Sequence, residues 1–175
     1  MISNPKYGWC DFKLGDFIGT PSYLTNVPMD LLDAFIDYYT RGYGAAHFDE
    51  EGSEFILLLE GYTPYIIEEK DDAKVHAFYD LSIKDLAKEV ITDIISNLDG
   101  WCDNFVRYGD PKDQELSEQF KCLLEDRVNE LRNIIERGKT YGYETLPTVR
   151  ERDARCGYLF MRRGVNPNPY LRELH

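Results

Sequence analysis

The chain has 175 residues, of which 43% are hydrophobic and 14% aromatic, and its formal net charge is −12. This apolar content excludes a disordered acidic chain, and the length suits one domain with an appendage. The longest apolar runs, such as FILLL at residues 55–59, are too short to span a bilayer. The first residues also lack the pattern of a signal peptide, so we expect a cytoplasmic protein.

Charge is distributed unevenly along the chain. Residues 1–138 carry 28 acidic and 13 basic residues, whereas residues 139–175 carry 4 acidic and 7 basic ones. We therefore expect a single acidic α+β domain at residues 1–138. A basic C-terminal arm containing Pro and Asn follows at residues 139–175, docked on the domain or on a partner. The acidic body argues against nucleic-acid binding, which needs a basic patch.

The first half of the chain predicts strands around one helix. Residues 8–25 predict two short strands, in the first of which an apolar face (Cys10, Phe12, Leu14) alternates with a mixed one (Trp9, Asp11, Lys13). Apolar residues at helical spacing, with Pro28 in the first turn and Gly42 at the end, predict a helix over residues 28–41. Four strand-like segments joined by short turns then predict an antiparallel meander at residues 45–49, 53–60, 64–69 and 74–80.

Two amphipathic helices are predicted in the second half of the domain. One begins after Ser82, whose hydroxyl is placed to cap it, and continues to about Leu98. The other begins at Asp110 and Pro111 and ends at Gly138. These elements predict one antiparallel sheet of about five or six strands. The helix of the N-terminal half and a C-terminal helical hairpin pack on it.

The tetrapeptide GWCD occurs twice, at residues 8–11 and 100–103, and contains both tryptophans and two of the four cysteines. The first copy begins a predicted strand and the second ends a predicted helix. The two settings differ, so we interpret the copies as two core anchors and not as a duplicated unit.

Catalytic and metal-binding patterns are weak. The cysteines show no CxxC pairing and the histidines no metal-binding spacing, so we expect no metal, no cofactor and free, mostly buried thiols. The sequence has no nucleophile elbow, P-loop or dinucleotide fingerprint. We therefore expect a protein that is not an enzyme.

The acidic connections of the predicted meander are the better candidate for function. DEEGSE at residues 49–54 and EEKDD at residues 68–72 are separated by one intervening turn, so both connections are expected at one edge of the sheet. Nearby tyrosines add side chains that interfaces favour. The candidate partner-binding residues are Asp49, Glu50, Glu51, Glu54, Tyr62, Tyr65, Glu68, Glu69, Asp71 and Asp72.

The segment YGWCDFKLGDFIGTPSYLTNVPMDLLDAFIDYY at residues 7–39 resembles small bacterial immunity-type proteins of toxin systems. The resemblance covers about the first half of the chain and contains no mechanistic motif. It implies tight binding to a cognate toxin domain, often a basic nuclease, whose active site the immunity protein blocks or distorts. A basic toxin domain is accordingly the expected protein partner, and the chain itself is expected to be a monomer or a homodimer.

Two alternatives remain at the level of the sequence. One is a structural or adaptor protein that associates with itself through the basic arm. The other is an enzyme with an unrecognised site, in which Cys10 or Cys102 is combined with His47 or His76 at a cleft.

Overall fold

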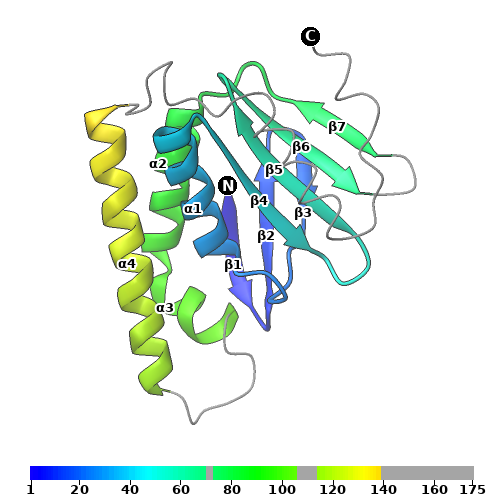
Figure 1. The fold of residues 1–175 in the computed structure, drawn as a ribbon. Helices are drawn as coiled ribbons and strands as arrows, with labels where there is room; N and C mark the ends of the chain where they lie inside the picture. Colours follow the sequence, from blue (N-terminus) through cyan, green and yellow to red (C-terminus); the bar gives the residue numbers. More distant parts are fainter. Residues whose placement is uncertain (70–72, 106–113, 139–175) are drawn as a thin grey trace. The chain divides into compact units, whose positions relative to one another are not determined.

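The computed structural model describes residues 1–69, 73–105 and 114–138. Within these residues the chain forms a three-stranded and a four-stranded antiparallel sheet and four α-helices, which confirms the expected α+β class (Figure 1). All the described elements belong to one compact unit, Met1–Tyr141. The arm expected at residues 139–175 lies outside the described residues.

The smaller sheet consists of β1 (Ile2–Lys6), β2 (Trp9–Leu14) and β3 (Phe17–Gly19), in that order. The alternation expected in β2 is confirmed, because every second side chain from Cys10 to Leu14 is buried and the others are exposed. The sequence pattern does not predict β1, since Pro5 and polar neighbours interrupt its apolar residues. β1 and β2 are joined by a tight turn in which Tyr7 has a φ of 55° and Gly8 a φ of 81°.

The first helix, α1 (Val27–Arg41), begins with proline in its first turn and ends at Gly42, which has a left-handed φ of 90°. The predicted helix is therefore confirmed, and the proline and the glycine lie at its two ends as the sequence predicts. The chain then turns into β4 (Tyr43–Asp49), which packs closely against α1. A Cβ atom added to Gly44 would lie 1.8 Å from the carbonyl oxygen of Ala34, so this approach requires glycine.

The larger sheet is the predicted meander, formed by β4, β5 (Glu54–Glu60), β6 (Thr63–Glu69) and β7 (Lys74–Ala77) in chain order. All neighbouring strands are antiparallel. The prediction of one sheet with five or six strands is wrong, because β1–β3 and β4–β7 form separate sheets. The apolar segment of residues 55–59 lies in β5 and is flanked on both sides by other strands of its sheet.

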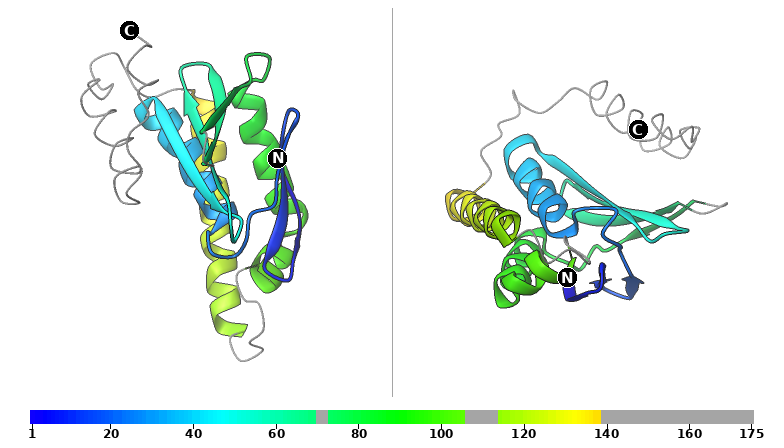
Figure 2. Two further views of the ribbon diagram at one scale, coloured as in Figure 1. Left: turned by 90° about the vertical axis from the view of Figure 1, so that its right-hand side faces the viewer. Right: turned by 90° about the horizontal axis from the view of Figure 1, so that it is seen from below.

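The two sheets lie face to face and share a hydrophobic core (Figure 2). The ring of Phe12 in β2 lies 5.4 Å from the ring of Phe48 in β4 and 5.0 Å from that of Phe55 in β5. Phe17 in β3 also contacts Phe55, at 4.9 Å between ring centroids. Packing of aromatic side chains therefore joins the two sheets, each of which has its own backbone hydrogen bonds.

The remaining helices are α2 (Ile83–Ser96), the short α3 (Leu98–Gly100) with the π-helical turn η1 (Trp101–Phe105), and α4 (Gln114–Arg137). The hydroxyl of Ser82 accepts a hydrogen bond from the backbone N–H of Asp85 at 3.3 Å, which confirms the predicted cap. The expected start of the last helix at residues 110–111 lies outside the described residues. The separate helical hairpin is not confirmed, because α1, α2 and α4 all pack against one another.

The two GWCD copies have different environments, as predicted. The side chain of Trp101 is fully buried in η1, and its indole N–H donates to the backbone carbonyl of Asp93 at 3.4 Å. Cys10 and Cys102 are both buried free thiols, but Trp9 is 37% exposed. The prediction that Trp9 anchors the core is therefore wrong, because β2 turns it to the polar face of its sheet.

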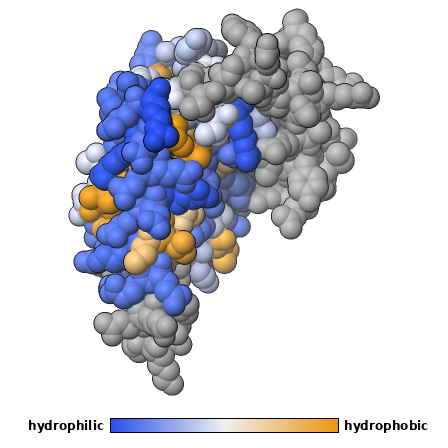
Figure 3. Space-filling view, turned by 60° about the vertical axis from the view of Figure 1, so that its left-hand side comes forward, coloured by the Kyte–Doolittle hydropathy of each residue, from blue (hydrophilic) through white to orange (hydrophobic). Residues whose placement is uncertain are grey.

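The helical side of the domain is mainly hydrophilic, with separate apolar side chains between the charged ones (Figure 3). The amino group of Met1 contacts the carboxylates of Glu89 and Asp93 and so ties β1 to α2. Among the described helices, none combines the length and apolarity needed to cross a bilayer.

Candidate functional site

The acidic clusters of the two connections lie at the same end of the larger sheet. Asp49 pairs with Glu54 across β4 and β5, and Glu54 pairs with Glu69 across β5 and β6. These three residues occupy one cross-strand row, so their side chains point to the same face of the sheet. The structure thus brings the two clusters together at one edge, as expected, while Asp71 and Asp72 lie outside the described residues.

This row belongs to the face of the larger sheet that points away from β2 and β3, which we call the outer face. Strand alternation and the cross-strand register define its members. They are Tyr43, Ala45, His47, Asp49, Glu54, Ile56, Leu58, Glu60, Thr63, Tyr65, Ile67, Glu69, Val75 and Ala77. The opposite, inner face contributes its apolar side chains to the core shared with β2, β3 and α1.

Three carboxylates in one row give the outer face an acidic end. Like charges directly opposite each other in a sheet repel and reduce its stability. The imidazole of His47 lies beside this row, with Nε2 at 2.8 Å from Oε2 of Glu54.

Glu50, one of the predicted site residues, accepts two hydrogen bonds that stabilise the fold. Its Oε1 accepts a hydrogen bond from the backbone N–H of Thr20 at 2.6 Å, and its Oε2 accepts one from the hydroxyl of Ser53 at 2.7 Å. The carboxylate therefore links the segment after β3 to the connection between β4 and β5. Its neighbour Glu51 is exposed at the tip of that connection, with a φ of 55°.

Glu68 lies on the inner face, so the structure does not bring it together with Glu54 and Glu69. Its Oε1 lies 2.5 Å from Nε2 of His76 and 3.9 Å from Nζ of Lys74, both on the neighbouring β7. Adjacent residues of a strand point to opposite faces, so Glu68 and Glu69 lie on opposite sides of the sheet.

The two predicted tyrosines occupy different places. Tyr65 is half-buried in the middle of the outer face, where it pairs with Leu58 of β5 and Ala77 of β7. Tyr62 is 87% exposed in the turn between β5 and β6, at the end of the sheet opposite to the acidic row. Of these two tyrosines, only Tyr65 therefore belongs to the outer face.

Sequence reasoning did not identify the apolar part of the outer face. Ile56, Leu58, Ile67 and Val75 form a band across three strands, and none of them belongs to the hydrophobic core. Ile56 at its centre is 6% exposed, Leu58 and Ile67 are half-buried, and Val75 on the last strand is 58% exposed. The run at residues 55–59 carried this signal, because it is apolar at successive positions and therefore on both faces of β5.

The structure does not bring together the thiols and imidazoles of the enzyme alternative. Cys10 is in the core, whereas His47 lies on the outer face of the larger sheet and His76 beside Phe17. Burial raises the pKa of the Cys10 thiol to about 12 and that of Cys102 to about 11. Neither thiol is therefore disposed to form the thiolate that a nucleophile needs near neutral pH.

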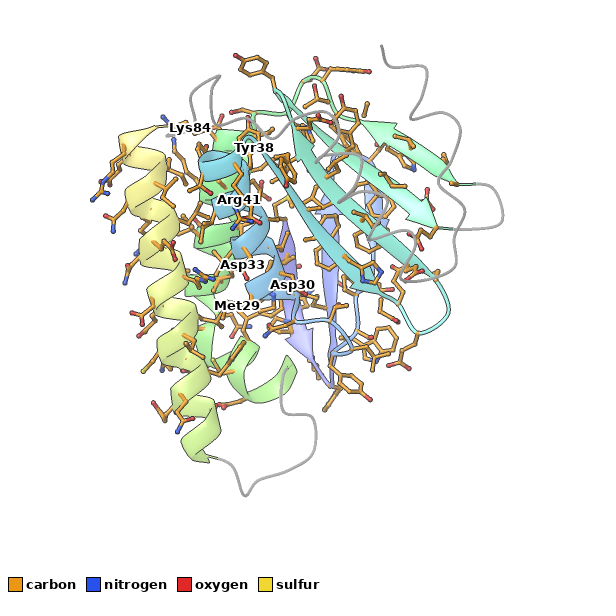
Figure 4. All side chains as sticks on the ribbon, viewed as in Figure 1. Met29, Asp30, Asp33, Tyr38, Arg41 and Lys84 are labelled. Atoms are coloured by element: carbon orange, nitrogen blue, oxygen red, sulfur yellow. The ribbon has the colours of Figure 1, made fainter. Side chains whose placement is uncertain are left out.

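A second group of carboxylates lies where α1 meets α4 (Figure 4). Burial, aided by the nearby Asp33, raises the pKa of Asp30 to about 6. Burial also raises the pKa of Asp33, against the influence of Arg127, whose Nε lies 3.0 Å from its Oδ1. These contacts join α1 to α4.

In the part of the chain that the structure describes, no group of three or more His, Cys, Asp or Glu residues is arranged to hold a metal ion.

A scan against protein-family models, a search of curated proteins and a search of solved structures each returned no match.

Proposed function

We propose that this chain is a non-catalytic binding protein of the immunity type, which neutralises a cognate bacterial toxin domain by binding it directly. In this proposal the partner is a basic protein domain, the compartment is the cytoplasm, and neither a cofactor nor a nucleic acid takes part. The chain acts as a stoichiometric inhibitor.

The acidic row on the outer face is the observation that carries the proposal. Asp49, Glu54 and Glu69 come from three neighbouring strands and converge on one end of one face. A basic partner is drawn to this end because long-range attraction to an acidic surface accelerates encounter.

Inhibition by this route needs a fast encounter and a slow release. The net charge of −12 supports electrostatic steering toward a cationic surface. Large half-buried side chains on the same face as the carboxylates, such as Tyr65, supply area that can be removed from water on binding. Release then requires both groups of contacts to break, which lengthens the lifetime of the complex.

Co-expression with the candidate toxin tests the proposal. The C-terminal domain encoded by the reading frame next to the gene for this chain is expressed in a bacterial host with and without the chain. We expect growth to stop without the chain and to recover with it, and the two purified proteins to form a 1:1 complex in light scattering. Unimpaired toxicity in the presence of soluble, folded chain contradicts the proposal.

Charge reversal then tests the acidic end of the sheet. Glu51→Lys changes an exposed side chain at this end, and Asp126→Lys changes an exposed side chain on α4 by the same charge. We expect Glu51→Lys to weaken protection of the host and Asp126→Lys to leave it intact. Equal protection by the two variants would move the binding surface away from the larger sheet.

A further inference from the structure

We propose that the contact between α1 and α4 is a proton-controlled latch, which holds α4 against α1 at mildly acidic pH and loosens it as the pH rises. The latch consists of Asp30, Asp33 and Asp37 on α1 and of Arg127 and Glu130 on α4. This proposal goes beyond the proposed function, because it concerns the response of the helices to protons and does not depend on the partner.

The carboxylates of α1 lie along one side of the helix. Asp30, Asp33 and Asp37 are spaced three and four residues apart, so they follow one another on a single helical stripe. All three residues are half-buried, and Asp30 and Asp33 are labelled in Figure 4. The charge of Asp33 opposes ionisation of Asp30, and the charge of Asp37 opposes ionisation of Asp33. The stripe is therefore a row of like charges that is partly removed from water.

The helix α4 brings one guanidinium group to this row. Nε of Arg127 lies 3.0 Å from Oδ1 of Asp33, and Nη1 of Arg127 lies 2.6 Å from Oε2 of Glu130. One cation is thus shared between a carboxylate of α1 and a carboxylate of α4, and Glu130 adds its own negative charge beside Asp33. On α1 itself, Nη1 of Arg41 lies 3.1 Å from Oδ1 of Asp37.

The other neighbours of α1 contact it through apolar residues. The elements α2, β4 and β5 also pack against α1, and they contribute Val90, Ala46 and Leu57 to the hydrophobic core that includes Phe35 of α1. Within the described residues, the charged groups that act on the carboxyls of Asp30 and Asp33 all lie on α1 and α4. The balance of charge in the latch is therefore set by these two helices.

Docking of α4 is coupled to the removal of water from the carboxyl groups. One stripe of α4 is buried, consisting of Leu124, Val128, Leu131 and Ile135. Arg127 directly precedes one of these residues, so the docked stripe holds the guanidinium against Asp33. Burial raises the pKa of both carboxyls, that of Asp30 to about 6. In a loosened state, renewed contact with water would return these pKa values toward about 4.

The sign of the pH dependence follows from this difference. The docked state binds the proton of Asp30 more tightly than the loosened state, so protonation favours docking. This contribution is fully present below the pKa of the loosened state and is lost as the pH rises through about 6. Between about pH 5 and about pH 7.5 we expect the equilibrium constant for loosening of α4 to increase several-fold, after allowance for partial exposure.

Amide hydrogen exchange of the full chain, followed by mass spectrometry, tests the latch. Exchange is measured at about pH 5 and about pH 7.5, and exchange times are scaled for the intrinsic rate of each amide. The amides of the central strand β5 provide the internal reference for opening of the whole domain. We expect α4 to lose protection several-fold relative to β5 at the higher pH. An unchanged ratio between α4 and β5 overturns the proposal.

Replacement of the titrating group gives the matched comparison. Asp30→Asn retains the size of the side chain and cannot ionise, so we expect the ratio between α4 and β5 to become nearly independent of pH. Asp16→Asn, at an exposed position of the smaller sheet's connection, removes the same charge and should keep the full pH dependence. A pH dependence that persists in Asp30→Asn, or that disappears equally in Asp16→Asn, overturns the proposal.

A second variant tests the role of the shared cation. Arg127→Gln leaves the carboxylates of Asp33 and Glu130 without this guanidinium. We expect α4 to lose protection several-fold relative to the unmodified chain at about pH 7.5, and less at about pH 5, where more of the carboxyl groups are protonated. An equal loss at both pH values would show that Arg127 acts only through packing, and the proposal would fail.

Discussion

At the scale of single residues, Gly44 shows how one missing side chain sets the distance between a helix and a strand. An added Cβ atom at this position would lie 1.8 Å from the carbonyl oxygen of Ala34, far inside van der Waals contact, and the obstacle is backbone and not a movable side chain. We expect Gly44→Ala to lower the free energy of unfolding by about 3 kcal/mol or more, as measured by urea denaturation.

Gly61→Ala provides the control for that measurement. An added Cβ at Gly61 meets nothing within 4 Å, although its φ of 60° disfavours alanine. The expected loss is therefore about 1 kcal/mol from the backbone alone. If Gly44→Ala lowers the free energy of unfolding by no more than Gly61→Ala does, β4 does not approach α1 as closely as described here.

Asp30 makes stability depend on pH in an unusual direction. Burial raises its pKa from 3.8 in the unfolded chain to about 6 in the folded one, so the folded state holds the proton more tightly. The contribution of Asp30 to the free energy of unfolding is fully present below the unfolded-state pKa. This contribution is lost as the pH rises through the folded-state pKa of about 6. We expect Asp30→Asn to raise the free energy of unfolding by about 1 kcal/mol at pH 7.5, after allowance for partial exposure.

Thermal unfolding at two pH values checks this prediction. The gain from Asp30→Asn should disappear at about pH 3 and below, where the carboxyl group is protonated in both states. Asp16→Asn, at an exposed position on the smaller sheet's connection, controls for the loss of one negative charge. A gain of equal size at both pH values, or an equal gain in Asp16→Asn, would contradict the assignment.

At the scale of elements, the two sheets depend on one aromatic cluster. Phe12 contacts Phe17 of its own sheet and Phe48 and Phe55 of the other. We expect Phe12→Ala to lower the free energy of unfolding by about 3–5 kcal/mol, because it opens a cavity between the sheets. Near-ultraviolet and far-ultraviolet circular dichroism should still give coincident transitions; a smaller sheet that melts first would show that the two sheets do not share a core.

Local chemistry explains which elements the sequence could predict. Pro28 and Gly42 bound α1, the hydroxyl of Ser82 caps α2, and short turns join β4–β7, and each of these signals acts within a few residues. The division into two sheets was not predictable in this way. It depends on contacts between residues far apart in sequence, such as Phe12 with Phe55, which local periodicity does not report.

The same reasoning applies to the candidate site. Alternate connections of a meander share an edge, so the meeting of Asp49, Glu54 and Glu69 could be predicted. The inward position of Glu68 follows from alternation only once the register of β6 is known. The outer face was missed because an apolar run indicates burial without stating what covers each side.

At the scale of the whole molecule, net charge and surface chemistry act together in the proposed function. Electrostatic steering is screened by salt over about 10 Å at 0.1 M ionic strength. Mutations at the acidic end are therefore expected to change the association rate, and to do so more at low salt than at high salt.

Stopped-flow kinetics of association between the chain and the toxin domain that it neutralises test the central claim most directly. The rate constants of the unmodified chain, Glu51→Lys and Asp126→Lys are measured from 0.02 to 0.5 M salt, a range we choose to span weak and strong screening. Binding at the acidic end of the larger sheet predicts that Glu51→Lys slows association several-fold at low salt and flattens the salt dependence, while Asp126→Lys differs little from the unmodified chain. Identical rates and salt slopes for Glu51→Lys and the unmodified chain would contradict the claim.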